Sequence, residues 1–432
     1  MTCLKVDRNT YVPLQEYEDL LNYCSQTYGT PLSSNALTEG ALFDYLSTFY
    51  KEVLEGLTFD ISKGVRRTNP NARKYSFSQF LKEYMKVSKE YCVNSRTGRY
   101  SYAEDVRAKI DLYQPNFMNS LGKLWSDIDS NKGICTYLPH MVYVDNQVDV
   151  NGDPLYVLKP RYSRKEGATH RINTSEPNIQ SLKKQHRREF LVPREGFTFV
   201  QADISGQDPA VFFNGLCRDE DIIKGFYEVG EYYLPVVSKV AGIPMDEVDT
   251  ELRNSYKIGI LSLMNGKTVN NLAVDMGSMQ HASDLIEFVN SNPMYRKFIA
   301  SAQRELKTRR PVAKSLVGDL TREIKETGWR GLNQMKNSPI QMTGIALFSI
   351  SIYAFYSKLN ELYPDFVDKQ FGEVLEFVRP VLHLHDEVLL EVRNIPDLPE
   401  ASAEALKWAL EIQFEDWAPM RAEPLISERY CL

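Results

Sequence analysis

Residues 381–392, with the sequence VLHLHDEVLLEV, constrain the fold most, because apolar residues alternate on both sides of a short acidic centre. This alternation predicts two β-strands joined by a tight turn at His385-Asp386-Glu387. A second alternating run, FTFVQAD at 197–203, predicts another strand, and it ends in Asp203. Strands so far apart in a largely helical sequence predict an α+β fold in which they share one sheet. Each acidic centre alone is more typical of a turn or a helix cap than of a functional site.

The rest of the chain predicts helices and one further hairpin. Segments with helical periodicity are found at 41–95 (in two stretches), 104–128, 209–356 (with turns) and 400–415. Alternating residues on both sides of the Asn151-Gly152 pair predict the hairpin. Residues 1–40 carry no motif that indicates their role.

Composition excludes several classes of protein. Of the 432 residues, 43% are hydrophobic and 25% are charged, as in ordinary soluble globular chains. The longest apolar run, 345–356, is too short to cross a bilayer and predicts a buried helix. No secretory signal is recognisable at the start, so we expect an intracellular protein with no membrane partner. The six cysteines are widely spaced and lack a C-x-x-C pair, so we expect reduced, structural thiols.

Charge is distributed unevenly along the chain. The net charge of −6 argues weakly against a polyanionic partner, but residues 159–194 contain ten Lys or Arg against three Glu. That stretch is a candidate surface for binding nucleic-acid phosphates. Arg304, Lys307, Arg309 and Arg310 form a second basic cluster. A solvated basic face without a ligand explains either cluster equally well.

Three further segments combine cations or amides at defined spacings. One of them has residues at steps of four: Arg253, Lys257, Leu261 and Asn265. These residues share one face of a helix, and its two cations could bind a triphosphate, although such a pair is also common on solvated helices. The segments 171–180 and 337–341 combine Pro with amide side chains, which suit minor-groove hydrogen bonds. Each of them could equally be a loop or a helix cap.

Taken together and in this order, the motifs resemble those of the family A DNA polymerases, the bacterial DNA polymerase I type, over roughly residues 94–432. The similar segments are Thr169–Gln180 (T-x-R-L-x-S-x-x-P-N-x-Q), Asp203–Asp208 (motif A, D-Y-S-Q-I-E), Arg253–Gly266 (motif B, R-x3-K-x3-F-x3-Y-G), Asn337–Gln341 (N-x-P-x-Q) and His385–Glu387 (motif C, H-D-E). The run TGRYSYAEDVRAKIDLY is similar to the region near the tip of the family's thumb. The combination is specific, although each motif alone is not.

The resemblance implies a template-directed DNA polymerase that extends a primer 3′-hydroxyl with dNTPs on primer-template DNA. Asp203 and Asp386 would bind two Mg2+ ions ~3.5–4 Å apart, which activate the 3′-hydroxyl and stabilise the leaving pyrophosphate. Glu387 would be a further catalytic residue beside the metals. The implied nucleotide-binding residues are Arg253, Lys257, Leu261, Asn265 and Asp208. The implied DNA-binding residues are Arg171, Asn178, Gln180, Asn337, Gln341 and His385.

Several positions depart from the family pattern. The acidic residue that excludes a ribose 2′-hydroxyl is Asp208, one methylene shorter than the usual Glu, and Leu261 and Asn265 replace the aromatic residues of motif B. Weak discrimination against ribonucleotides is therefore expected, unless Asp208 and Asn265 bond to each other as a smaller pair. The family's Arg before N-x-P-x-Q is Asn333 here, and the His that commonly helps bind phosphate is Leu234. Two ligand contacts would thus be lost.

The resemblance also predicts a right-hand architecture with an antiparallel-sheet palm, helical fingers and a helical thumb. The expected divisions are an N-terminal segment of unknown role (1–40), the thumb (41–136), the first palm part (137–225), the fingers (226–332) and the second palm part (333–432). Fewer than a hundred residues precede the thumb pattern, so no 3′–5′ exonuclease domain of ~150 residues is expected. We expect a monomer in the cytoplasm of a bacterium, or of a phage in its host cell, whose processivity factor the sequence does not identify.

Two alternatives remain open at this stage. A single-subunit RNA polymerase-like enzyme is compatible with the short Asp208 and the Ser205-Gly206 pair in motif A. A non-catalytic, nucleic-acid-binding remnant of a polymerase is the other alternative. Retention of Asp203, Asp386 and both motif B cations argues against that decay.

Overall fold

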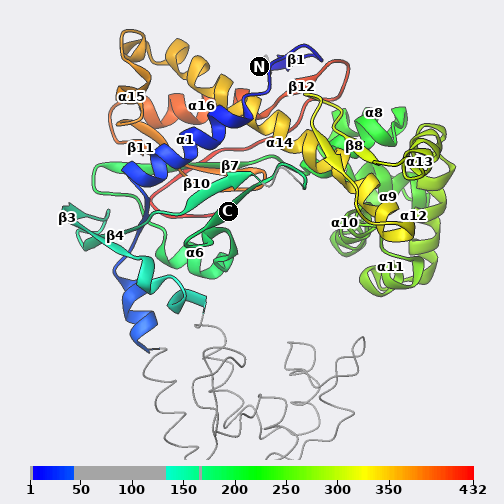
Figure 1. The fold of residues 1–432 in the computed structure, drawn as a ribbon, viewed down its shortest axis with the longest axis horizontal. Helices are drawn as coiled ribbons and strands as arrows, with labels where there is room; N and C mark the ends of the chain where they lie inside the picture. Colours follow the sequence, from blue (N-terminus) through cyan, green and yellow to red (C-terminus); the bar gives the residue numbers. More distant parts are fainter. Residues whose placement is uncertain (1–2, 43–132, 165–167) are drawn as a thin grey trace, which may run out of the picture.

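The computed structural model describes residues 3–42, 133–164 and 168–432. An antiparallel sheet with the strand order β10-β11-β7-β13 forms its centre (Figure 1). The strands are β10 (Val378–Leu384), β11 (Glu387–Arg393), β7 (Phe197–Asp203) and β13 (Leu425–Ser427). Helix and antiparallel sheet together confirm the predicted α+β class.

Alternate side chains of the central sheet enter two separate cores. Val200 and Leu390 pack in the larger core with residues of helices α1, α14 and α16. Phe199 and Leu389 point to the other face, where they pack with residues of β2, β4 and α6. The helices are α1 (Leu14–Thr27), α6 (Lys184–Phe190), α14 (Gly328–Leu362) and α16 (Leu398–Leu410). Because both faces are covered, β7 and β10 are buried along almost their whole length.

Several small sheets surround this centre. Their strands are β1 (Lys5–Val6), β2 (Thr30–Leu32), β3 (Val142–Val148), β4 (Pro154–Leu158), β5 (Arg161–Arg164), β6 (Ile172–Ser175), β8 (Val312–Lys314), β9 (Thr321–Glu323) and β12 (Gln413–Phe414). β3 and β4 form the hairpin predicted around Asn151-Gly152, and β2 pairs with β4 on its other side. The parallel pair β1–β12 joins the two ends of the described chain.

A helical body lies at one end of the molecule, opposite β3 and β4 (Figure 1). Its helices are α8 (Glu220–Val229), α9 (Tyr233–Ala241), α10 (Thr250–Met264), α11 (Val269–Met276), α12 (Met279–Ser291) and α13 (Pro293–Glu305). Short elements complete the fold: η1 (Leu138–His140), η2 (Ile179–Ser181), α7 (Gln207–Val211), the π-helical turn η3 (Phe212–Leu216), η4 (Met245–Glu247), η5 (Pro364–Phe366) and α15 (Phe371–Val374). The long α14 runs from the helical body towards the helices that cover the sheet (Figure 1).

Helix α14 contains the apolar run 345–356 predicted to be a buried helix. Within the described residues it is long and apolar enough to cross a membrane, but 78% of its most apolar stretch is buried inside the molecule. Its side chains from Ile345 to Ile352 are buried against α1, α16 and the sheet. Such burial is typical of the core helix of a folded domain.

The structure corrects two sequence predictions about secondary structure and assigns a place to a segment whose role was open. The last helix ends at Leu410 rather than at 415, because Gln413 and Phe414 pair with β1. The hairpin β8–β9 interrupts the segment predicted to be helical. Residues 1–40, whose role was open, contribute α1 to the larger core. The helices predicted at 41–95 and 104–128 fall almost entirely outside the described residues.

The described cysteines are free thiols: Cys3, Cys24, Cys135, Cys217 and Cys431. Cys92 lies outside the described residues. Burial raises the pKa of the Cys24 and Cys217 thiols to about 12, so both are protonated and unreactive at neutral pH.

Candidate active site

The central sheet brings the predicted acidic residues together. Asp203, the last residue of β7, lies directly opposite Glu387, the first residue of β11. The N–H of Ile204 donates to the carbonyl oxygen of Asp386 at 3.0 Å. His385 and Asp386 form the turn between β10 and β11, and His385 has a left-handed φ of +59°. Because buried side chains fix the strand register, this register places all three acidic residues at one edge of the sheet.

The three acidic residues are close enough to affect one another electrostatically. Burial raises the pKa of Asp386 to about 6, and the negative charges of Asp208 and Asp203 add to this effect. Burial also raises the pKa of Glu387 to about 7, against the opposing effects of Tyr430 and Arg187. The Tyr430 hydroxyl donates to Glu387 Oε2 at 3.1 Å. The site therefore concentrates negative charge, which a bound cation would stabilise.

The donor atoms present fit a hard divalent cation. Glu387 Oε1 is buried and has no hydrogen-bond partner among the described residues. Within residues 3–42, 133–164 and 168–432, no group of three or more His, Cys, Asp and Glu side chains is arranged to hold a metal ion. Magnesium is commonly held by one or two protein carboxylates, with water and substrate phosphates as its other ligands. Asp203 and Asp386 supply such a partial set.

Asp208 is paired with Arg171 and not with Asn265. Arg171 Nη2 lies 3.2 Å from each Asp208 carboxylate oxygen. The Asn265 amide nitrogen donates to the carbonyl oxygen of Leu261 at 2.9 Å, and its oxygen accepts from Asn337 at 3.5 Å. The smaller Asp208–Asn265 pair considered from the sequence therefore does not form in this structure.

Helix α10 presents the two cations of motif B on one face, as their spacing predicts. Asp249 caps the helix by accepting a hydrogen bond from the N–H of Leu252 at 2.7 Å. Both cations lie over the ring of Tyr233, the Arg253 guanidinium carbon at 5.2 Å and Lys257 Nζ at 5.6 Å from its centre. The distances are typical of cation–π contacts.

Sequence reasoning missed two residues that contact the cations of this face, Glu231 and Tyr233. Arg253 donates from Nε and Nη2 to the carboxylate of Glu231. The aromatic side chain against the cations is Tyr233, one residue before Leu234, which was assigned to the place of the family's His. The run Gly-Glu-Tyr-Tyr at 230–233 could have indicated these contacts, because an acidic and an aromatic side chain are both able to bind a cation.

The amide side chains of the segment 171–180 form hydrogen bonds within the protein. Gln180 Nε2 donates to the carbonyl oxygens of Ile172 and His383 at 3.1 and 3.0 Å. Asn178 Oδ1 accepts from the Thr174 hydroxyl at 3.0 Å. These bonds fix the segment against β10 of the acidic hairpin. Asn337 and Gln341 are half-buried on α14.

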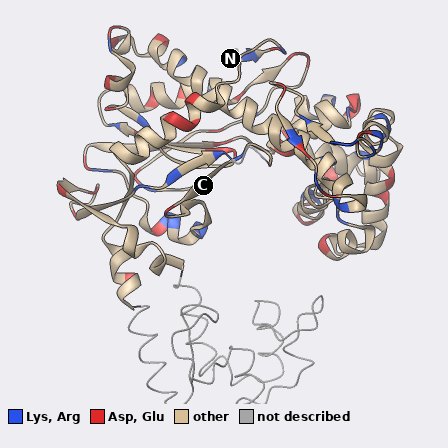
Figure 2. Ribbon diagram, viewed as in Figure 1, with Lys and Arg blue, Asp and Glu red and all other residues tan. Residues whose placement is uncertain are grey.

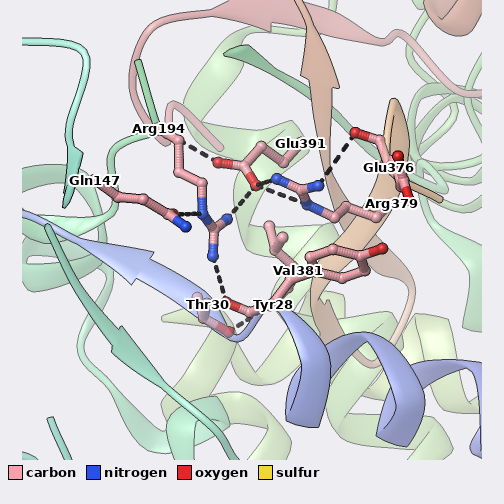
Figure 3. Close-up of polar contacts among 8 residues, drawn as sticks. All are labelled: Tyr28, Thr30, Gln147, Arg194, Glu376, Arg379, Val381 and Glu391. Atoms are coloured by element: carbon pink, nitrogen blue, oxygen red, sulfur yellow. Dashed lines mark hydrogen bonds and ion pairs between the residues drawn. The ribbon is translucent and has the colours of Figure 1, made fainter. Parts of the chain in front are cut away.

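The basic stretch 159–194 is not one continuous cationic surface. Arg194 is 7% exposed and donates to Glu391, and Glu391 also accepts from Arg379 at 2.8 and 3.0 Å (Figure 3). Arg164 pairs with Glu18 at 2.9 Å. The predicted phosphate surface is therefore wrong for these two residues. Figure 2 shows that Lys and Arg remain grouped on α6.

Comparison with known structures shows which class of protein this fold defines. The structure resembles the "POL domain of Pol1 from M. smegmatis complex with DNA primer-template and dNTP", with a TM-score of 0.68 and 16% identity. The match covers 96% of this chain and 70% of the other. The fold is therefore that of a right-hand polymerase domain.

Sequence comparison identifies the family. The model of DNA polymerase family A matches residues 51–415, and the chain belongs to that family. It is 24% identical to the thermostable DNA polymerase I of Thermus aquaticus over 299 residues, 66% of this chain and 34% of that protein. It is also 24% identical to DNA polymerase I of Mycobacterium leprae, over 52% of this chain and 25% of that protein. The chain thus spans about a third of the length of the curated relatives it matches.

Proposed function

We propose that this protein is a DNA-directed DNA polymerase that extends a primer 3′-hydroxyl with dNTPs on a DNA template. One observation carries the proposal: β7 and β11 place Asp203 opposite Glu387, with Asp386 at the adjoining turn. Family membership and the likeness to a polymerase domain described with primer-template and dNTP support the same conclusion. The cytoplasm of a bacterium, or of a phage-infected cell, is the proposed location.

Divalent cations, proposed here as two Mg2+ ions, would be held by Asp203 and Asp386. Bound there, they would supply charge stabilisation and lower the pKa of the attacking hydroxyl. Glu387 stands beside these residues, and its Oε2 is held by Tyr430. The buried strands keep the carboxylates in place, so little reorganisation is needed when substrate binds.

The remaining proposed roles follow from where each side chain lies. Lys257 is exposed on α10 and would contact the triphosphate of the incoming nucleotide, together with Arg253. Asp208 lies near the carboxylates and would limit the space around the sugar, with Leu261 and Asn265 on the opposing helix. The proposed contacts to the DNA duplex are Arg171, Asn178, Gln180, Asn337, Gln341 and His385.

A primer-extension assay tests the proposal directly. A labelled primer on a template with a 5′ overhang is incubated with dNTPs or rNTPs, in Mg2+ or in excess chelator. Templated extension with dNTPs that requires Mg2+ is expected. Extension with rNTPs alone would favour the RNA polymerase-like alternative, and DNA binding without any extension would favour the non-catalytic remnant.

A further inference from the structure

The cationic face of α10, formed by Arg253 and Lys257, already binds a carboxylate of the protein, that of Glu231. Glu231 lies in the turn between α8 and α9, where Gly230 ends α8 in the left-handed conformation, with φ +79°. Its Oε1 accepts from Arg253 Nε at 2.8 Å, and its Oε2 accepts from Arg253 Nη2. Guanidinium groups bind carboxylates and phosphates with the same two-point geometry.

The two cations of α10 differ in how free they are to bind a ligand. Arg253 Nη1 donates to Asn254 Oδ1 at 3.1 Å, so each nitrogen of this guanidinium has a partner within the protein. Lys257, one turn further along, is exposed and makes no ion pair with any described residue. An anion arriving at this face can therefore contact Lys257 at once, but it must compete with Glu231 for Arg253.

We propose that Glu231 determines the affinity of this face for polyphosphate, because it occupies the anion-binding groups of Arg253 until a ligand displaces it. The inference rests on the proposed function only in taking the ligand to be a nucleoside triphosphate. Glu231 is tethered beside Arg253 and competes as an intramolecular ligand. A triphosphate carries more negative charge and gains Lys257 as a second contact. When pyrophosphate leaves, the same carboxylate returns to Arg253, so Glu231 raises the KM for nucleotide and favours product release.

The substitution Glu231→Gln tests the proposal, because it removes the charge and keeps the size of the side chain. We expect the KM for dNTP to fall about threefold to tenfold, with kcat little changed, which corresponds to the loss of a partly exposed ion pair. Calorimetric titration with inorganic tripolyphosphate should show a tighter Kd by the same factor. The effect on KM should disappear in an Arg253→Ala background, because the two residues act through one contact.

The matched control is Glu251→Gln, an exposed acid in the first turn of the same helix. It removes one negative charge from the same helix and should change KM less than twofold. Glu231→Asp keeps the charge but shortens the reach to Arg253, so it should give an intermediate KM. This second variant keeps the proposal testable if Glu231→Gln does not fold.

Two outcomes would overturn the proposal. A raised KM in Glu231→Gln would mean that Glu231 orients Arg253 towards the ligand, and an unchanged KM and Kd would mean that the pair does not compete with phosphate. Tripolyphosphate binding reports on Glu231 even in a protein that does not extend DNA. Failure of extension together with the expected change in tripolyphosphate affinity would therefore count against the proposed function alone.

Discussion

Asp203 and Asp386 lie at one edge of the sheet, and neither side chain has a hydrogen bond or an ion pair with another described residue. We expect Asp203→Ala and Asp386→Ala each to lower the rate of primer extension roughly a thousandfold or more, because the lost groups act on charge that develops in the transition state. Affinity for primer-template should stay within about twofold, since phosphate contacts elsewhere supply most of it. Single-turnover extension and fluorescence anisotropy measure the two quantities. Turnover within tenfold of the wild type in either variant would contradict the assignment.

The contacts of Asp208 bear on sugar selection. Arg171 binds the carboxylate of Asp208. Leu261 and Asn265 occupy the two positions of motif B that carry aromatic residues in the family pattern. We expect weak rejection of ribonucleotides in the wild type. Asp208→Glu alone should change the ratio of kcat/KM for dNTP over rNTP by less than about threefold, because the longer acid lacks an aromatic support. Adding Asn265→Tyr should raise the ratio more than the single changes combined, because a tyrosine there would supply the support that the longer acid lacks.

The measurement is kcat/KM for both nucleotides in the wild type and in the single and double variants. A wild-type ratio as high as that of a polymerase with Glu and Tyr at these positions would show that Asp208 and Arg171 already form a complete barrier.

At the scale of elements, Glu391 of β11 joins three parts of the chain around the central sheet (Figure 3). It is fully buried between the guanidiniums of Arg194 and Arg379, and Arg194 also donates to the carbonyl oxygen of Tyr28. Glu391→Gln leaves two buried cations without their counter-charge, so the free energy of unfolding should fall by about 3–5 kcal/mol. Urea unfolding at pH 7 measures it. The control Glu376→Gln changes an exposed acid whose backbone carbonyl, not its side chain, contacts Arg379.

The same ion group predicts how stability depends on pH. Burial alone would raise the pKa of Glu391, but Arg194 and Arg379 outweigh it and lower the pKa below its ordinary value of 4.5. A carboxylate whose pKa is lower in the folded state stabilises the fold fully above its unfolded pKa, and this contribution is lost as the pH falls through the folded pKa. Below about pH 5, the wild type should therefore lose more stability than Glu391→Gln. Parallel urea curves for the two proteins down to pH 3 would contradict this.

Helix α1 is attached to the acidic hairpin through Tyr17. Its hydroxyl lies 2.9 Å from His383 Nδ1, whereas Nε2 of the same ring is buried without a partner among the described residues. Burial lowers the pKa of His383 to about 3, so the ring is neutral. Tyr17→Phe should destabilise the protein by roughly 1–3 kcal/mol, because it leaves Nδ1 unsatisfied as well. Tyr23→Phe, an exposed tyrosine on the same helix, should change the thermal midpoint very little.

Sequence patterns correctly predicted those elements that form because of residues close together in the chain. Strand 197–203 and the hairpin 378–393 follow from apolar alternation, and their acidic ends follow from turn chemistry. The end of α16 could not be read locally, because Gln413 pairs with a strand that starts at Lys5. Pairing over such a distance depends on the whole core.

In the candidate active site as well, local spacing predicted some features, whereas contacts between distant residues could not be predicted. Spacing placed Arg253 and Lys257 on one face, but it could not show that Glu231 binds one of them. Arg194 looked like a surface cation because its partner Glu391 is nearly two hundred residues away in sequence. Tertiary structure determines which residues form ion pairs, and the spacing of residues within one segment does not predict it.

At the scale of the whole molecule, residues 51–415 are accounted for by the polymerase family model. We expect a protein consisting of residues 1–432, given a 3′-mismatched primer and Mg2+ without nucleotides, to leave the primer at full length over times in which a correct primer with dNTPs is fully extended. Gel analysis of end-labelled primer checks this. Trimming that persists in Asp203→Ala would reveal a nuclease site separate from the carboxylates described above.

The central sheet is completed by strands that are made far apart in time on the ribosome. β13 covers the edge of β7, and the N–H of Cys431 donates to the side chain of Gln201, 230 residues earlier in sequence. When Asp203 leaves the ribosome, β7 is therefore complete, but its pairing partners β11 and β13 have not yet been synthesised. An unpaired apolar strand is prone to pair with other chains. Slowing translation between β7 and β11 should for this reason increase aggregation during synthesis, even though the finished protein keeps that strand at the centre of its sheet.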